Sequence, residues 1–488
     1  MDSLKYEAVI GLEIHAQLRT RTKLFCGCST EFGKAPNSLT CPVCLGFPGA
    51  LPVLNAEAVA MAIRLALALH ARVHRRSQFS RKNYFYPDLP KGYQITQYRF
   101  PLAEDGWLQI DADGRSKRVG VDRIHLEEDA GKSIHDGLPD SSEKTSLDFN
   151  RSGIPLLEIV SRPDLASSAE AVALLQLIRT TLLYLDVCDG NMEQGSLRCD
   201  ANISLKKSGS RGMGVKTEIK NLNSFRYLQK ALDFEARRQA AELEAGRSVR
   251  HETRLWDAGQ SRTMSMRSKE EAHDYRYFPE PDLPLLDLNE DFIRRQKAAL
   301  PELPRDKASR LVETYEISAH EAGLLIQTRA LADYFERATA VSQNPKQTAH
   351  WIVREVLQYL HEHHSEIDQF PISAERLAGL IRLVDSGALT LTAAKETVFP
   401  KMIAVQAEAS VIVEEESLGQ VFDEGALKKT AREVVAAHPG PLAQYRQGKK
   451  QVFGFFVGLL MKETKGRANA ALATKILKEI LDGDKAPS

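Results

Sequence analysis

Hydrophobic and polar positions alternate over short stretches of roughly the first 290 residues. Ala8 to Ile14, Leu156 to Val160 and Ala201 to Leu205 are rich in aliphatic residues and are bounded by Gly, Pro, Asn and Asp, so they are predicted strands. Ala56 to His70 and Ser168 to Leu185 carry apolar residues at helical spacing and are predicted helices. This region is therefore expected to be an α+β domain.

The hydrophobic spacing becomes helical after a Pro-rich stretch around Leu283-Pro284, which we interpret as a domain boundary. Asn344-Pro345 predicts the start of one helix, because Asn is a favoured N-cap and Pro a favoured first residue. Ser373 starts another helix, which Gly387 can end. The second region is expected to be an all-α helical domain of about 110 residues.

A second break falls between Val405 and Glu416, before a small helical segment that forms the tail of the chain. From Gly425 to Ser488 there are 12 Lys and Arg against 5 Asp and Glu, a net charge of +7, although the whole chain is neutral. We predict three domains, at residues 1–292, 293–405 and 406–488. The basic tail is the candidate RNA-binding part.

Cations and aromatic residues interleave along this tail. The cations are Lys449, Lys450, Lys462, Lys465 and Arg467. The aromatic residues are Tyr445, Phe453, Phe455 and Phe456. On the pattern alone, RNA contact and a small aromatic core with solvated cations are equally good interpretations.

The composition places the chain among ordered globular proteins. Its 488 residues are 43% hydrophobic and 27% charged, and its 65 basic residues balance 65 acidic ones, so no global charge attracts it to nucleic acid or to a membrane. The residues after Met1 lack the pattern of a signal or transit peptide, and no apolar run reaches the ~18 residues that a bilayer requires. We expect a cytoplasmic protein.

Four of the six cysteines are clustered as Cys26-Gly-Cys28 and Cys41-Pro-Val-Cys44. Two close pairs favour a tetrahedral Zn²⁺ site, although the first pair has one intervening residue where zinc knuckles usually have two. An iron–sulfur cluster, a redox couple of Cys41 and Cys44, and unliganded thiols are the alternatives. Because four thiolates leave no open position for substrate, this insertion at residues 26–44 is expected to be structural.

Acidic residues on three segments are the candidate catalytic groups. Glu13 and His15 alternate with Leu12 and Ile14, so both should point to one face of a strand. A second group is Glu127-Glu128-Asp129, and a third is Glu158, which lies within an aliphatic strand and needs a partner or a metal if it faces inward. Singly, each acid is better explained as a solvated or ion-paired residue.

Basic residues accompany these acids in the sequence, namely Lys82, Lys91, Arg123, Lys132 and Arg151. Carboxylates that hold Mg²⁺ beside cations that neutralise phosphate oxygens are what phosphoryl transfer requires. The chain has no G-x-x-x-x-G-K-[ST] and no G-x-G-x-x-G motif, so any ATP is expected to bind without a Walker loop.

Six longer motifs follow one another in order along nearly the whole chain. They are Gly11 to His15, Arg81 to Gln97, Leu126 to Ser133, Asp148 to Pro163, Tyr275 to Pro284 and Lys465 to Asn469. Together they resemble the GatB/GatE family of tRNA-dependent amidotransferase subunits. GatE proteins carry an inserted domain for which this chain has no room, so the GatB branch is the closer match.

The resemblance implies a catalytic domain of the glutamine synthetase/guanido kinase type, an antiparallel sheet with helices on one face. A helical domain and a small YqeY-like tail domain that contacts tRNA would follow. It also implies Mg²⁺ ligation by Glu13, His15, Glu128 and Glu158. Lys82, Lys91 and Arg151 are the candidate contacts to ATP phosphates or to the substrate carboxylate.

The resemblance further implies the reaction and the partners. ATP would phosphorylate the side-chain carboxylate of Glu-tRNA(Gln) or Asp-tRNA(Asn), and ammonia would then displace the phosphate. The sequence has no Ser-rich amidase signature and no convincing catalytic Cys, so ammonia is expected from a partner amidase, GatA, with small GatC bracing the pair. A free-standing ATP-dependent carboxylate–amine ligase and a non-catalytic, zinc-containing RNA-binding scaffold are the alternatives.

Overall fold

The computed structural model describes residues 5–135, 143–266, 275–418, 424–464, 468 and 470–483. The chain divides into two compact units, residues 1–306 and 307–488. Within the described residues, every helix is too short or too polar to cross a membrane.

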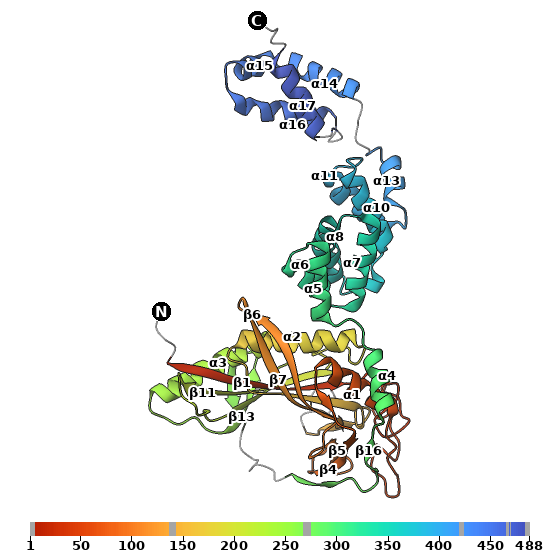
Figure 1. Ribbon diagram of the computed structural model, residues 1–488, viewed down its shortest axis with the longest axis vertical. Helices are drawn as coiled ribbons and strands as arrows, with labels where there is room; N and C mark the ends of the chain where they lie inside the picture. Colours follow the sequence, from red (N-terminus) through yellow and green to blue (C-terminus); the bar gives the residue numbers. More distant parts are fainter. Residues whose placement is uncertain are drawn as a thin grey trace. The chain divides into compact units, whose positions relative to one another are not determined.

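A large sheet forms the centre of the N-terminal unit (Figure 1). Its 12 strands, counted over the described residues, run in the order β14-β13-β12-β11-β1-β10-β7-β5-β4-β15, and β6 joins β7 to β2. All pairs in it are antiparallel except β12 with β13. The strands are β1 (Tyr6–Gln17), β2 (Arg72–Val73), β4 (Phe79–Asn83), β5 (Tyr93–Gln97), β6 (Ala103–Ala112), β7 (Arg115–Glu128), β10 (Pro155–Ser161), β11 (Leu197–Lys207), β12 (Thr217–Lys220), β13 (Glu252–Asp257), β14 (Arg262–Ser265) and β15 (Arg276–Pro279).

Two short pairs lie outside the large sheet. They are β3 (Arg76–Ser77) with β16 (Leu286–Asp287), and β8 (Lys132–Ile134) with β9 (Ser146–Asp148). The helices of this unit are α1 (Ala56–Ala68), α2 (Ser168–Tyr184), α3 (Phe225–Glu244) and α4 (Glu290–Ala298).

The central strand β1 separates an aliphatic face from a polar face. Ile10, Leu12, Ile14 and Ala16 are buried, while the polar residues between them, Glu13 and His15, are partly exposed. The buried side chains belong to one hydrophobic core with residues of α1, α2 and α3, which pack against the sheet (Figure 1). The strand period of two thus leaves Glu13 and His15 on the face opposite the aliphatic core.

Side-chain caps fix where the three core helices begin. Asn55, Ser167 and Ser224 each accept a hydrogen bond from a backbone N–H in the first turn of α1, α2 and α3, respectively. Such a cap satisfies a donor that would otherwise be left without a partner, and it is worth about 1 kcal/mol. The helices therefore begin at defined residues of the sequence.

The second unit is helical and contains two hydrophobic clusters, one within residues 311–413 and one within residues 427–481. Its first helices are α5 (Pro304–Tyr315), α6 (Ala319–Leu325), α7 (Arg329–Ser342), α8 (Pro345–Trp351), η1 (Ile352–Val356), α9 (Leu357–Glu362), η2 (Ile367–Gln369), α10 (Ala374–Asp385), α11 (Leu391–Ala393), η3 (Ala394–Val398), α12 (Phe399–Ala404) and α13 (Ala409–Glu415). The tail helices are α14 (Glu424–Ala436), α15 (Pro439–Arg446), η4 (Lys450–Val452), α16 (Phe453–Glu463) and α17 (Ala470–Asp482).

The predicted strands lie within β1, β10 and β11, and the predicted helices correspond to α1 and α2, so these expectations are confirmed. Asn344 caps α8 and Ser373 caps α10, as the sequence predicts. The mixed α and β content is confirmed. The period of two predicts these strands correctly because one face of the sheet is aliphatic and the other face is polar.

Candidate active site and metal centres

Three neighbouring strands bring charged side chains together on the polar face of the sheet. His15 of β1 lies opposite Glu158 of β10, and Glu158 lies opposite His125 of β7. Glu13 and Glu127 are each two residues away from one of these positions, so the strand alternation places them on the same face. We call Glu13, His15, His125, Glu127 and Glu158 the carboxylate–histidine cluster.

The distances within this cluster are short. His15 Nε2 lies 3.6 Å from a Glu158 oxygen and 3.8 Å from oxygens of both Glu13 and Glu127. His125 Nε2 lies 3.0 Å from Glu158 and 3.7 Å from Glu127. The ligand atoms of Glu13, His15 and Glu158 are all within 4.8 Å of one another, as are those of His125, Glu127 and Glu158. These are two overlapping groups of potential ligands, one from β1 and β10 and one from β7 and β10, and both include Glu158.

Burial and charge perturb the titration of this cluster. Burial and the neighbouring charge of Glu158 raise the pKa of Glu13. Burial lowers the pKa of His125, but the charge of Glu158 and hydrogen bonds to Glu127 and Glu158 outweigh burial and raise this pKa to about 9. Burial would also raise the pKa of Glu158, but His125 and His15 lower it. The two imidazoles on either side of Glu158 thus stabilise its ionised form.

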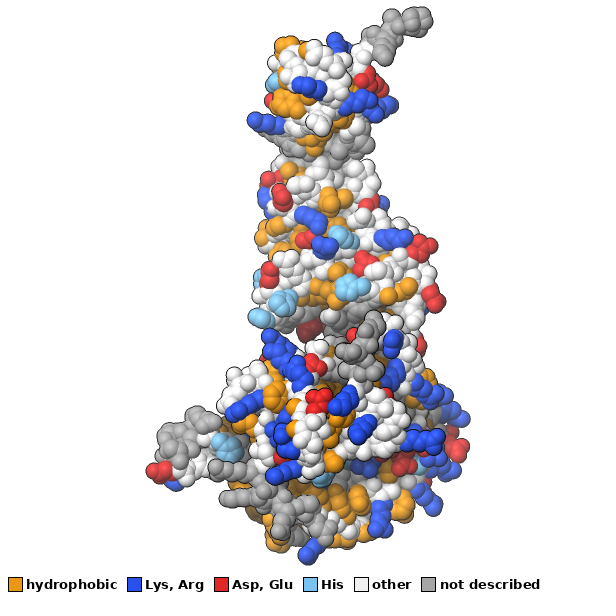
Figure 2. All heavy atoms as spheres, turned by 90° about the vertical axis from the view of Figure 1, so that its left-hand side faces the viewer, with side chains coloured by type: hydrophobic (Ala, Val, Ile, Leu, Met, Phe, Trp, Pro, Cys, Tyr) orange, Lys and Arg blue, Asp and Glu red, His pale blue; other side chains and the backbone are white. Residues whose placement is uncertain are grey.

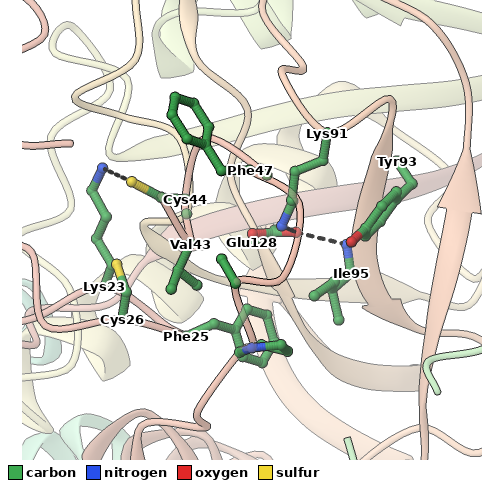
Figure 3. Close-up of a pocket in the computed structure, with 14 residues that line it drawn as sticks. Lys23, Phe25, Cys26, Val43, Cys44, Phe47, Lys91, Tyr93, Ile95 and Glu128 are labelled. Atoms are coloured by element: carbon green, nitrogen blue, oxygen red, sulfur yellow. Dashed lines mark hydrogen bonds and ion pairs between the residues drawn. The ribbon is translucent and has the colours of Figure 1, made fainter. Parts of the chain in front are cut away.

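Glu128, which was expected from the family resemblance among the Mg²⁺ ligands, takes part in a different interaction. Its carboxylate pairs with Lys91 and accepts a hydrogen bond from the backbone N–H of Ile95 at 2.9 Å (Figure 3). It lines a cavity of about 50 Å³ with Lys91, Tyr93 and residues of the cysteine insertion. Successive residues of a strand point to opposite faces, so Glu127 and Glu128 point to different sites.

His125 and Glu127 were not assigned to the metal site from the sequence. The signal was present in Arg123-Ile-His-Leu-Glu-Glu128, where His125 and Glu127 alternate with the buried Ile124 and Leu126. Glu13, His15 and Glu158 were named, and the structure brings these three together.

Lys82 lies on β4 with its ammonium 4.7 Å from the ring of Tyr275 and 5.8 Å from that of Tyr84. No carboxylate in the described part of the chain lies within ion-pair distance of it. Lys91, by contrast, is paired with Glu128. Of these two lysines, Lys82 has the ammonium that is available to an anionic ligand.

Arg151 supports the loop before β10. Its guanidinium donates hydrogen bonds to the carbonyls of Ala130 at 3.0 Å and Gly131 at 2.6 Å, and it lies 3.8 Å from Asp129. Although burial opposes it, the charges of Arg198 and Arg151 lower the pKa of Asp129. Arg151 thus ties the segment after β7 to the segment before β10 in this structure.

The four clustered cysteines converge on one point. Their Sγ atoms lie within 4.8 Å of one another, and Cys41 Sγ is 3.9 Å from Cys44 Sγ. A tetrahedral Zn²⁺ with bonds of about 2.3 Å separates its sulfur ligands by about 3.8 Å, so the four thiols fit this ion. We call Cys26, Cys28, Cys41 and Cys44 the cysteine cluster.

Negative charge in the cysteine cluster concentrates on Cys44. A hydrogen bond from Cys26, together with the backbone N–H of Cys41 and the charge of Lys23, lowers the pKa of Cys44 to about 4 against the effect of burial. The same contact between thiols raises the pKa of Cys26. Lys23 is fully buried, and its ammonium lies 3.6 Å from Cys44 Sγ (Figure 3).

The cysteine insertion also holds the loop that leads into β10. Two asparagine side chains link the insertion to this loop. The backbone N–H of Phe149 donates to Asn37 Oδ1 at 2.8 Å, and Asn150 Nδ2 donates to the carbonyl of Ala35 at 2.7 Å. The Ser152 hydroxyl donates to the carbonyl of Cys44 at 3.2 Å. The cysteine cluster is therefore joined by one short loop to the strand that carries Glu158.

In the tail, Lys449, Lys450 and Lys462 are exposed, whereas Lys465 and Arg467 lie outside the described residues. Phe456 is fully buried in the tail core, but Phe455 is 45% exposed. The aromatic residues are thus divided between core and surface. In the N-terminal unit, Lys and Arg side chains are spread among acidic and apolar ones over the face seen in Figure 2.

Comparison with known proteins identifies the family. The family model described as the GatB/GatE catalytic domain matches residues 8–294. The model described as the GatB domain matches residues 333–481.

Full-length relatives agree with these matches. The B subunit of the aspartyl/glutamyl-tRNA(Asn/Gln) amidotransferase of Chlorobaculum tepidum is 50% identical over 479 residues, which are 98% of this chain and 100% of the relative. Proteins of the same name from Thermodesulfovibrio yellowstonii and Carboxydothermus hydrogenoformans are each 48% identical, over 98% of this chain and 100% and 99% of their own lengths. The chain therefore belongs to the GatB/GatE family of tRNA-dependent amidotransferase subunits.

Proposed function

We propose that this chain phosphorylates the side-chain carboxylate of Glu-tRNA(Gln) or Asp-tRNA(Asn) with ATP and then presents the acyl phosphate to ammonia. The observation that carries the proposal is the carboxylate–histidine cluster, in which five charged or titratable side chains from three strands meet on one face of a sheet. A carboxylate cannot expel oxide, so amide formation needs a better leaving group, and phosphate supplies it.

The cluster fits a divalent cation. Glu13, Glu127 and Glu158 offer carboxylate oxygens, which Mg²⁺ prefers, and His15 lies beside all three. Mg²⁺ held there would offset the negative charge that develops on the phosphoryl oxygens. We replace Glu128 by Glu127 in the proposed ligand set, because Glu128 is engaged by Lys91.

Residues around the cluster have separate proposed roles. Lys82 would contact a phosphate oxygen of ATP or of the RNA, because its ammonium is held only by aromatic rings among the contacts described. Arg151 would position the loop that precedes Glu158. The pair of Lys91 and Glu128 would shape the cavity that it lines beside the cysteine insertion.

The cysteine cluster would hold a structural Zn²⁺. Its closed set of four thiols leaves no position for substrate, and the buried ammonium of Lys23 offsets part of the negative charge of four thiolates. The proposed contribution is to the rigidity of the loop before β10.

The remaining assignments come from the names of the relatives and from family resemblance. Ammonia would be delivered by an amidase subunit, GatA, and GatC would complete a heterotrimer in the cytoplasm, where aminoacyl-tRNA is used. The catalytic sheet would be of the glutamine synthetase/guanido kinase type. The proposed division is a catalytic domain at 1–292, a helical domain at 293–405 and a YqeY-like tail at 406–488. Three separate hydrophobic clusters support three parts, although Ala409, Ile412 and Val413 pack in the second cluster.

The proposal is tested by measuring ATP hydrolysis and Gln-tRNA or Asn-tRNA formation by the assembled complex, with and without mischarged tRNA. We expect hydrolysis that depends on the mischarged tRNA. Hydrolysis that ignores the tRNA would favour a ligase acting on a free amino acid. Complete absence of hydrolysis would favour an RNA-binding scaffold.

The tail contact is tested separately by the salt dependence of tRNA binding. Replacing Lys449, Lys450 and Lys462 by Gln should weaken binding for all tRNA sequences and reduce the salt slope by about one for each phosphate that is no longer neutralised. Glu463→Gln, next to Lys462 in α16, is the matched control and should not reduce the slope. An unchanged slope in the triple variant would reject these three contacts.

A further inference from the structure

Exposed aromatic side chains gather at the edge of the sheet next to the carboxylate–histidine cluster. They come from β15, from the connection between β4 and β5, and from the residues just after β5, and these strands are neighbours in the order β5-β4-β15. The exposed residues are Phe85, Tyr86, Tyr98, Phe100, Tyr275 and Phe278. Contiguous exposed apolar patches often mark interaction surfaces.

Two of the rings already form a stack. Tyr98 and Tyr277 lie 4.0 Å apart between ring centroids, with an angle of 11° between their planes. Tyr98 is 47% exposed, so part of its ring is open to solvent. Nucleic-acid bases that are not paired bind proteins by adding to such stacks.

A cation lies beside this stack. Lys82 pairs in register with Tyr277 across β4 and β15, and its ammonium is held near the rings of Tyr275 and Tyr84. An aromatic stack for bases next to a cation for phosphate is the arrangement found where proteins bind single-stranded nucleic acid.

The stack lies on the same side of the sheet as the reaction site. Thr96 donates a hydrogen bond of 3.0 Å to Glu127. Tyr277, on which Tyr98 stacks, lies opposite Lys82 in the sheet. Lys82 in turn lies opposite Gln94, two residues before Thr96 on β5, so strand alternation places Tyr277 and Thr96 on one face. Burial, followed by the charges of Glu127 and Glu158, raises the pKa of Tyr277. The carboxylate of a glutamyl or aspartyl ester lies only about 7 Å, two residue lengths, from the ribose that carries it.

We propose that Tyr98 and Tyr277, with Lys82, form a stacking platform for the unpaired 3′-terminal nucleotides of the RNA that carries the aminoacyl group. This inference rests on the proposed function, because it assigns a subsite to the same substrate. The terminal base of the RNA must lie close to the reacting carboxylate, because only about 7 Å separates that carboxylate from the ribose, and the stack lies on the face of the sheet that carries the cluster. RNA is therefore the occupant to which the geometry points.

The test uses the full-length chain in its assembled complex and a tRNA with 2-aminopurine at its 3′-terminal position, whose fluorescence is quenched by stacking. Tyr98→Leu should relieve the quenching and weaken binding of the tRNA by ~10-fold, the effect of losing one stacked base. Tyr98→Phe keeps the ring and should behave as wild type. Phe32→Leu replaces an aromatic residue that is 74% exposed elsewhere in the same unit and is the matched control.

The other outcomes separate this inference from the proposed function. Loss of affinity for a non-hydrolysable ATP analogue in Tyr98→Leu, with tRNA binding unchanged, would assign the ring to ATP and overturn the inference. Loss of complex assembly would assign it to a partner protein and would also overturn it. If the wild-type complex quenches the fluorescence, Tyr98→Leu relieves the quenching, and the wild-type complex does not amidate the tRNA, the RNA subsite is supported and the proposed function is rejected.

Discussion

The N-terminal unit holds two clusters of potential metal ligands that are built in opposite ways. The cysteine cluster comes from residues 26–44, a single short segment. The carboxylate–histidine cluster comes from β1, β7 and β10, and its members Glu13 and Glu158 are far apart in the sequence. The first is a local structure with two tight turns, whereas the second exists only after three strands have paired.

This difference suggests different contributions to function. Four thiols that close around one ion leave no room for substrate and can only stabilise their surroundings. A cation bound by carboxylates and imidazoles along one side of a sheet keeps coordination positions for phosphate oxygens. The two clusters meet at the loop before β10, which contacts the cysteine insertion at one end and continues into the strand of Glu158 at the other.

The largest effect is expected from Glu158→Gln, which should abolish most amidation. Glu158 lies between His15 and His125, and its neutral replacement removes both a proposed cation ligand and the counter-charge of two imidazoles. We expect kcat for amidation to fall by at least ~100-fold while tRNA binding persists. Asp122→Asn, which alters an exposed acid on β7, is the control. Retained amidation in Glu158→Gln would remove the cluster from the reaction.

A comparison of Glu127→Gln with Glu128→Gln separates the two faces of β7. Glu127 lies near His15 and His125, so its replacement should weaken Mn²⁺ binding, measured by electron paramagnetic resonance, by roughly 10- to 100-fold. Glu128→Gln removes the partner of Lys91 and should leave Mn²⁺ affinity within about 3-fold of wild type. The opposite ranking would restore Glu128 to the metal site and exclude Glu127.

A smaller effect on catalysis is expected when the cysteine cluster is broken. Cys44→Ser should abolish bound zinc, measured by atomic absorption, and lower the Tm of the N-terminal unit by roughly 5–10 °C. Chelation of zinc from the wild-type protein is the control and should give the same shift. A variant that loses zinc and also loses all amidation at a temperature where it remains folded would contradict a purely structural role.

The mildest change concerns the loop that connects the two clusters. Gly153 has φ +84°, and an added Cβ would lie 3.4 Å from Cys44 Cβ and 3.5 Å from Lys23 Cδ. Gly153→Ala should therefore lower the free energy of unfolding by about 1 kcal/mol, measured by urea denaturation. Gly195→Ala has a similar φ of +79° but open space around the added methyl, so it isolates the backbone contribution. Equal losses in both would mean that the contact with the cysteine cluster adds nothing.

The sequence predicted most of the local structure of the site but not all of its members. The alternation of Glu13 and His15 with aliphatic residues placed them on the polar face, and the cysteine spacing indicated a four-thiol cluster. Glu128 was expected among the ligands from the family resemblance, whereas the alternation of His125 and Glu127 with Ile124 and Leu126 favours Glu127 on the polar face. The buried neighbours on β7, Ile124 and Leu126, resolve that choice in the structure.

Contacts between segments that are distant in the sequence could not be predicted, for a physical reason. Stacking of Tyr98 on Tyr277 and the pairing of Lys91 with Glu128 depend on strand order and register, which are fixed by the whole sheet and not by local propensity. The order of the amino acids was enough for β1, β10 and β11, the N-caps of α8 and α10, the convergence of the cysteines and the family. Which acids share a face became visible only with the folded sheet, because β10 pairs with β1 on one side and β7 on the other.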